Sequence, residues 1–124
     1  IFPDAWSLKS LEETWKQKSA AIFVAKTKEG MAGYLIFYYV LEEGEIARIA
    51  TAHSVRRQGA ASQMFRKLLD FCREQKITRI MLEVRENNEA ARQFYGKCGF
   101  TKDGIRRNYY ENPKENAVLM SVNL

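Results

Sequence analysis

The chain has 124 residues, of which 46% are hydrophobic and 28% charged, and its formal net charge is +5. This length is typical of one ordinary domain, so we expect residues 1–124 to form a single domain around one core. The composition excludes an intrinsically disordered chain, and the longest apolar run is about half the roughly 20 residues of a membrane-spanning helix. Neither a secretory nor a transit signal is visible, which predicts a cytoplasmic soluble protein.

Soft metal ligands are scarce in this sequence. Cys72 and Cys98 are the two cysteines, and His53 is the one histidine. A tetrahedral zinc site cannot be assembled from these residues, so we expect no metal. Both cysteines are predicted to be core thiols that form no disulfide.

The positive charge is concentrated in one segment. Residues 53–79 hold seven Lys and Arg residues but two acidic ones, whereas the rest of the chain is balanced. A local positive field of this kind favours a polyanion. The charge alone does not choose between a nucleotide phosphate and a nucleic acid.

The N-terminal third predicts a helix followed by a β-hairpin. Ser7 can cap a helix whose apolar stripe ends near Lys18. Residues 20–25 and 31–41 are rich in β-branched and aromatic side chains, which predicts two strands joined by a turn at residues 28–30.

The middle of the chain predicts a strand, a helix and a second strand. A turn is expected at residues 42–44 and a strand over residues 45–51. Apolar residues at helical spacing predict a helix over residues 59–75, followed by a strand over residues 77–84. This order implies a right-handed crossover between parallel strands.

The C-terminal part predicts one more helix and a hairpin. Asn87 or Asn88 can cap a helix that runs through Lys97. Residues 100–107 and 117–122 are expected to be strands. The whole chain therefore predicts an α+β fold, a mixed sheet flanked by about three helices.

The loop at residues 56–61 lies between a predicted strand and the basic helix. A helix N-terminus presents unpaired N–H groups, and the small residues Gly59, Ala60 and Ala61 let a ligand approach them closely. The loop therefore fits an anion, and an ordinary tight turn explains the same residues equally well.

Glu83 is unusual because Leu82 and Val84 flank it in a strand expected to be central and covered on both faces. One interpretation is a structural salt bridge with Arg85 or Arg48. The other is a buried carboxylate that acts as a general base.

Three other features have simple structural interpretations. Helical spacing favours a core position for Tyr95, and Asn88 fits a helix cap. The aromatic pair Tyr109 and Tyr110, beside Arg106, fits a surface hairpin whose rings pack against the sheet.

The loop pattern Arg56-x-x-Gly59-x-Ala61 resembles the Arg/Gln-x-x-Gly-x-Gly/Ala signature of the GNAT superfamily of acetyl-CoA-dependent N-acetyltransferases. More specific motifs, from about Phe2 to the C-terminus, resemble the RimI subfamily of ribosomal-protein alanine N-acetyltransferases. The motifs are Phe2-Pro3, Trp6-Ser7, Leu82-Glu83-Val84-Arg85-x-x-Asn88, Ala90-Ala91, Phe94-Tyr95, Gly99-Phe100 and Ile105-Arg106-Arg107-Asn108-Tyr109-Tyr110. The resemblance implies a GNAT-like α+β fold with a mixed, mostly antiparallel sheet of six to seven strands.

The sequence departs from the RimI-like pattern in two places. Relatives usually have a further N-terminal segment, so we expect the family's first strand and part of its first helix to be missing, which would open a sheet edge. His53 stands where the family often has Pro.

The resemblance implies that acetyl-CoA is the co-substrate. Backbone amides of the loop would hold its pyrophosphate, and the end of the preceding strand would pair with its pantetheine arm. The implied acetyl-CoA-binding residues are Ile49, Ala50, Thr51, Arg56, Arg57, Gln58, Gly59, Ala60, Ala61 and Asn88.

The resemblance also implies the catalytic residues and the acceptor. Glu83 would accept the proton of the amine and Tyr95 would protonate the departing thiolate, in a direct transfer without a covalent enzyme intermediate. Arg106, Tyr109 and Tyr110 would wall a groove for a protein N-terminus, and the RimI-like resemblance implies a ribosomal protein as the acceptor.

Two alternatives stay open. One is a GNAT enzyme for a small-molecule amine or for lysine, and the other is a non-catalytic module that binds CoA or nucleic acid. Nucleic acid is disfavoured because Phe65 and Phe71 lie within the basic helix, where they form no evident stacking platform. No membrane partner is expected.

Overall fold

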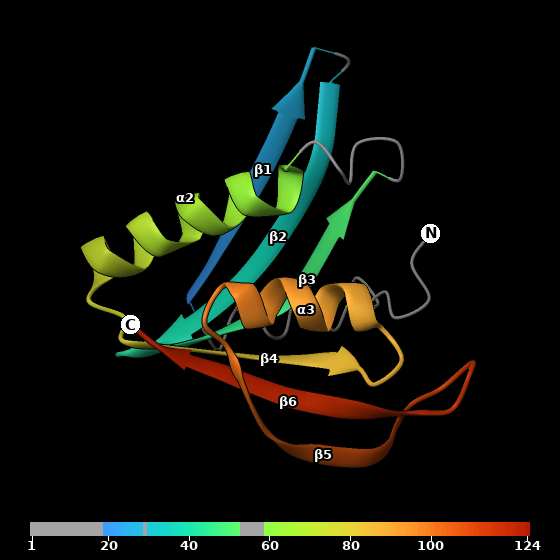
Figure 1. Cartoon of the computed structure of the whole chain (residues 1–124). Helices are drawn as coiled ribbons and strands as arrows, with labels where there is room; N and C mark the ends of the chain where they lie inside the picture. The colour runs from blue at the N-terminus through green and yellow to red at the C-terminus, as the bar shows by residue number, and fades with distance from the viewer. Residues whose placement is uncertain (1–18, 29, 53–58) are drawn as a thin grey trace.

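The computed structural model describes residues 19–28, 30–52 and 59–124, which form one six-stranded sheet and two helices (Figure 1). The elements are β1 (Ser19–Thr27), β2 (Gly30–Val40), β3 (Glu43–Thr51), α2 (Ala60–Gln75), β4 (Arg79–Arg85), α3 (Glu89–Lys97), β5 (Thr101–Tyr110) and β6 (Glu115–Asn123). The predicted α+β class is confirmed. The helix expected after Ser7 lies outside the described residues.

The strand order is β1-β2-β3-β4-β6-β5. Strands β3 and β4 are the parallel pair, and the other neighbours are antiparallel. The crossover between β3 and β4 runs through α2, as the order of predicted elements requires. The sheet is therefore mixed and mostly antiparallel, with β4 near its centre.

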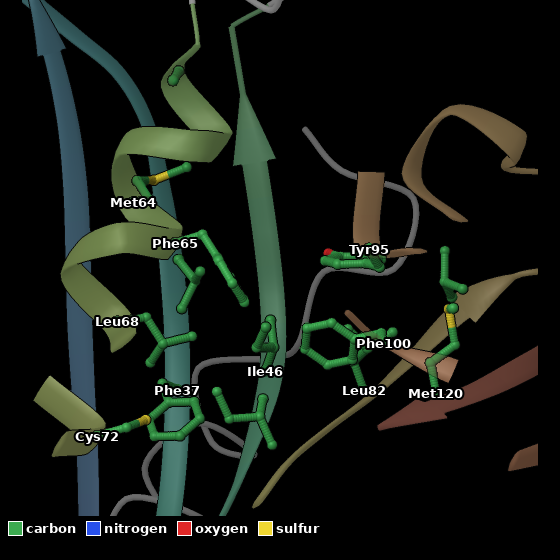
Figure 2. Close-up of a cluster of buried hydrophobic side chains, with 14 of the residues drawn as sticks. Phe37, Ile46, Met64, Phe65, Leu68, Cys72, Leu82, Tyr95, Phe100 and Met120 are labelled. Atoms are coloured by element: carbon green, nitrogen blue, oxygen red, sulfur yellow. The ribbon is translucent and has the colours of Figure 1, made fainter. Parts of the chain in front are cut away.

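Both described helices pack on one face of the sheet. The α2 side chains Met64, Phe65 and Leu68 are buried in the main hydrophobic cluster. Phe65 also meets Phe94 of α3 with ring centroids 6.4 Å apart, so the two helices share one core. Figure 2 shows this cluster of side chains between the helices and the sheet.

Strand β4 alternates between this core and the opposite face. Leu82 and Val84 are buried under the helices, whereas Met81 and Glu83 on the other face are half-buried. Glu83 therefore lies on the face of β4 that the described residues cover less.

The second turn lies earlier than the sequence predicts. Leu41 and Glu42 form it, with Leu41 at a φ of 54°, and Glu43 already begins β3. Gly44 is a strand residue, and a Cβ there would collide with the ring of Phe37. Its lack of a side chain serves core packing rather than the turn.

The two cysteines lie where the sequence predicts. Cys72 is fully buried, Cys98 is half-buried, and neither forms a disulfide. Burial raises the pKa of the Cys72 thiol to about 11. Within the described parts of the chain, no group of side chains could hold a metal ion. None of the helices described is long and apolar enough to cross a membrane.

Candidate active site

The parallel strands β3 and β4 stay together over a short stretch. Their register runs from Glu43 opposite Arg79 to Ile46 opposite Leu82. Past this point the strands diverge in Figure 1. A cavity of about 560 Å³ lies here, lined by β3, β4, α3 and β5. The opening exposes backbone groups of both strands that would otherwise pair with each other.

A β-bulge in β3 explains part of this divergence. Arg48 lies opposite Ile36 and Ile46 lies opposite Phe37, so Ala47 has no partner in the register with β2. A bulged strand bends and twists more strongly than a regular one. Ala47 lines the cavity. Nothing in the local sequence pattern signals this bulge.

Glu83 reaches this cavity from β4. Its side chain is 23% exposed, and its Oε1 lies 3.2 Å from Nη1 of Arg106 on β5. The Tyr109 hydroxyl lies near the Glu83 carboxylate, and burial together with this carboxylate raises the pKa of that hydroxyl. The salt-bridge partner is therefore Arg106 rather than the predicted Arg85 or Arg48.

An irregularity in β5 brings Tyr109 to Glu83. Arg106 lies opposite Ala117 and Tyr110 lies opposite Glu115, so β5 has extra residues between these two pairs. Within this bulge Asn108 has a φ of 53°, and its backbone N–H donates to Oδ1 of Asn116 at 2.9 Å. Asparagine tolerates this left-handed conformation better than most residues.

Arg85 fixes the β5–β6 hairpin instead of pairing with Glu83. Its Nη1 lies 3.2 Å from Oε1 of Glu115, and the two side chains are 17% and 10% exposed. The guanidinium also donates to the carbonyl oxygens of Pro113 and Glu111, each at 3.1 Å. It lies over the Tyr110 ring, 4.3 Å from the centroid. This pair could not be predicted from the sequence, because Glu115 is distant in the chain and no motif links the two residues.

Tyr95 lines the same cavity from α3, and it also belongs to the core. It is 4% exposed, and its ring centroid lies 5.5 Å from that of Phe100 (Figure 2). Burial raises the pKa of the Tyr95 hydroxyl well above its ordinary value of 10, with smaller contributions from Cys98 and Tyr110. The phenol is therefore protonated at neutral pH.

The aromatic pair at the C-terminal end of β5 forms one side of the cavity. The rings of Tyr109 and Tyr110 meet edge to face with centroids 5.0 Å apart, and both residues line the cavity. Tyr109 is 45% exposed. Arg106 lies over the Tyr109 ring, 4.9 Å from its centroid. The structure therefore brings Arg106, Tyr109 and Tyr110 together beside Glu83.

The end of β3 presents backbone groups to the opening. Ala52 donates its N–H to the Ala32 carbonyl oxygen at 2.8 Å. Because hydrogen-bonding directions alternate along an antiparallel ladder, the N–H groups of Ile49 and Thr51 point away from β2. They face the side that β4 has left, and Ala50 lies between them in the register with β2.

The N-terminus of α2 lacks a side-chain cap. Gly59 precedes the helix with a φ of 79°, and the space where its Cβ would lie is open. The first turn contains no acidic residue. Ala60 is buried, and Ala61 is half-buried beside it. N–H groups that no described side chain caps, with no carboxylate in the first turn, suit a phosphate group.

Asn88 is predicted both as a helix cap and as a residue of the acetyl-CoA site. Its side chain caps α3 by accepting the Ala91 N–H at 3.1 Å, and the residue also lines the cavity. The remaining predicted acetyl-CoA-binding residues, Arg56, Arg57 and Gln58, lie outside the described residues, as does His53.

Comparisons with known proteins agree with this geometry. The acetyltransferase (GNAT) family model matches residues 1–100. The [ribosomal protein bS18]-alanine N-acetyltransferase of Haemophilus influenzae is 31% identical over 122 residues, which cover 96% of this chain and 82% of the relative.

Solved structures share the fold. The crystal structure of the ribosomal-protein-S18-alanine N-acetyltransferase from Escherichia coli matches with a TM-score of 0.83 at 30% identity, over 95% of this chain and 77% of that one. A GNAT family acetyltransferase from Elizabethkingia anophelis, solved with acetyl-CoA bound, matches with a TM-score of 0.79 at 21% identity, over 95% and 84% of the two chains. The sequence, the fold and the open sheet agree: this chain belongs to the GNAT family of acetyl-CoA-dependent N-acetyltransferases.

Proposed function

We propose that this enzyme acetylates the N-terminal α-amine of alanine in ribosomal protein bS18. The observation that carries the proposal is the shared cavity of Glu83 and Tyr95, with Tyr109 and Tyr110 on one side of it. Relatives that are about one-third identical along most of this chain are named for the same acceptor. A ribosomal protein as acceptor places the reaction in the cytoplasm.

The chain offers suitable groups for acetyl-CoA. The uncapped N-terminus of α2, with open space at Gly59, fits the pyrophosphate. The N–H groups of Ile49 and Thr51, directed away from β2, fit the amide groups of the pantetheine arm. Acetyl-CoA held by these two features would have its thioester in the opening between β3 and β4, where Asn88 lines the cavity.

Glu83 and Tyr95 then supply the two proton transfers. The acceptor amine attacks the thioester carbonyl carbon while Glu83 accepts the amine proton, directly or through a water molecule. When the C–S bond breaks, Tyr95 donates its proton to the departing thiolate. Acetyl transfer is direct, so no group of the enzyme is acetylated.

An α-amine suits such a site better than a lysine does. With a pKa near 7.8, about a tenth of an α-amine is free base at pH 7, whereas for lysine, with a pKa near 10.4, the fraction is below about a thousandth. A single carboxylate is therefore a sufficient base for a protein N-terminus.

A panel of acceptors tests the proposal. The enzyme is incubated with acetyl-CoA and three probes: a peptide copying the alanine N-terminus of bS18, the same peptide with its α-amine formylated and one added lysine, and spermidine. Tandem mass spectrometry then locates any acetyl group. We expect acetylation of the free α-amine alone. Acetylation of lysine or spermidine, with the first peptide unchanged, contradicts the proposal.

A further inference from the structure

We infer that Arg106 is a positioning residue whose charge neutralises Glu83, so that the acceptor amine is not trapped beside that carboxylate as an unreactive ammonium ion. The inference rests on the proposed function and deepens it. It changes the role of Arg106 from a groove wall to a partner of the catalytic carboxylate.

Three contacts connect Arg106, Glu83 and Tyr109. The guanidinium Nη1 lies 3.2 Å from Oε1 of Glu83. The same guanidinium covers the Tyr109 ring at 4.9 Å, and the Tyr109 hydroxyl lies near the Glu83 carboxylate. Each of the three side chains thus contacts the other two. This closed set holds the carboxylate in one orientation on the face of β4 away from the helices.

Other charged groups surround the set. Glu45 of β3 lines both the main cavity and a neighbouring cavity of about 280 Å³, which also includes Glu83 and Arg106. Arg79 and Asp103 line the neighbouring cavity as well, and their side chains are 3.9 Å apart. The main cavity also has Arg48, Arg85 and Glu111 on its wall.

Among the contacts of the described residues, the cation that lies against Glu83 is Arg106. Arg79 also lies 3.5 Å from Glu43, and Arg85 lies 3.2 Å from Glu115. Arg106 is the residue whose guanidinium the described structure places against the Glu83 carboxylate. Removing its charge would therefore take away the cation that lies 3.2 Å from the Glu83 carboxylate.

The chemical consequence concerns the acceptor. An anionic carboxylate within about 4–6 Å of an amine favours the ammonium form and raises the amine pKa by one unit or more. An ammonium nitrogen has no lone pair, so it cannot attack a thioester. A guanidinium already paired with Glu83 offsets this attraction and lets the amine enter as its free base.

The test is the pH dependence of single-turnover acetylation of the bS18 peptide, with the enzyme saturated by both substrates. Rates in the saturated complex report ionisations of that complex. In Arg106→Gln we expect the acidic limb to move upward by about one pH unit, the lower end of the usual range, because Arg106 is half-exposed and partly screened. At pH values below the limb, Arg106→Gln should be about tenfold slower than the wild type. At pH values above it, the rates of the variant and the wild type should be equal.

Two further variants separate charge from structure. Arg106→Lys keeps the charge and should keep the acidic limb of the wild type. Arg107→Gln removes the same charge from the next, exposed residue of β5 and should leave the whole profile unchanged. Thermal unfolding of each variant confirms that the fold is intact.

The outcomes are distinct. An unmoved acidic limb in Arg106→Gln, or a loss of rate that is equal at every pH, overturns the role of Arg106 while leaving the proposed function in place. A limb that moves in Arg106→Lys as far as in Arg106→Gln also overturns it. If the wild-type enzyme does not acetylate the peptide at any pH, the proposed function itself fails.

Discussion

Ile46 of β3 and Leu82 of β4 form the last residue pair at which the two parallel strands stay in register. One residue further along β4, Glu83 already lines the cavity that opens between the strands. The candidate base therefore lies directly after the point at which the pairing between β3 and β4 ends. A regular parallel pair at this position would use the backbone groups to which we propose that acetyl-CoA binds.

Glu83→Gln should reduce turnover by about a hundredfold or more, because a carboxamide cannot accept the amine proton. Its affinity for acetyl-CoA should stay unchanged, since the side chain contacts Arg106 and Tyr109 rather than the predicted pyrophosphate site. Initial rates and calorimetric titration of acetyl-CoA measure the two quantities. Glu74→Gln, an exposed change on α2, is the charge-matched control. Equal turnover in the two variants would exclude Glu83 as the base.

Tyr95→Phe should reduce turnover without changing acetyl-CoA affinity, because the thiolate loses its proton donor. The raised pKa of Tyr95 also predicts a pH effect on stability. Its folded-state pKa lies above the unfolded value near 10, so its stabilisation is complete below pH 10 and is lost as the pH rises further. Urea unfolding at pH 9 and pH 11 should therefore show a smaller loss of stability in Tyr95→Phe than in the wild type. The same loss of stability in both proteins would show that the pKa of Tyr95 is not raised in the folded protein.

Arg85→Met should destabilise the protein by about 3 kcal/mol, since it leaves Glu115 as a nearly buried carboxylate without its cation. It should also raise KM for the acceptor peptide, because Arg85 holds the hairpin that carries Tyr110. Arg73→Met is the control: its ion pair with Asp70 is 80% and 70% exposed, so little change in stability is expected. Urea denaturation measures the free energy of unfolding of the two variants. An equal loss of stability in both would show that the Arg85 pair does not support the hairpin.

Gly59→Asp should weaken acetyl-CoA binding at least tenfold. The aspartate would place a negative charge at the free N-terminus of α2, where the pyrophosphate is proposed to bind. Gly59→Asn introduces a side chain of the same shape without the charge, and asparagine tolerates a φ of 79°. Calorimetry should find the asparagine variant closer to the wild type. Identical affinities for the two variants would place the pyrophosphate elsewhere.

The order of the elements could be predicted because its signals are local. The apolar residues of β4 alternate within one short strand, and Met64, Phe65 and Leu68 follow one another at helical spacing within α2. Both patterns can be recognised in a short stretch of sequence. Asn88 could be predicted as a cap for the same reason, since it bonds to a residue three positions away. Such patterns define the elements and the strand that carries Glu83.

The surroundings of Glu83 could not be predicted, because they depend on distant segments. Arg106 reaches Glu83 only after β5 pairs with β6 at the sheet edge, and Tyr109 reaches it only through the bulge at Asn108. Arg85, the nearer cation in the sequence, is instead occupied by Glu115. Spacing along one strand does not reveal which of two arginines the fold brings to a carboxylate.

The most direct test of the central claim is a crystal structure of the protein with a bisubstrate conjugate, in which an acetyl bridge joins CoA to the α-amine of the bS18 peptide. The account predicts that the bridge lies between β3 and β4, with Glu83 on the side of the peptide nitrogen and Tyr95 on the side of the sulfur. It also predicts the pyrophosphate at the N-terminus of α2. A conjugate seated outside this opening, or one with Glu83 turned away from the nitrogen, would contradict it.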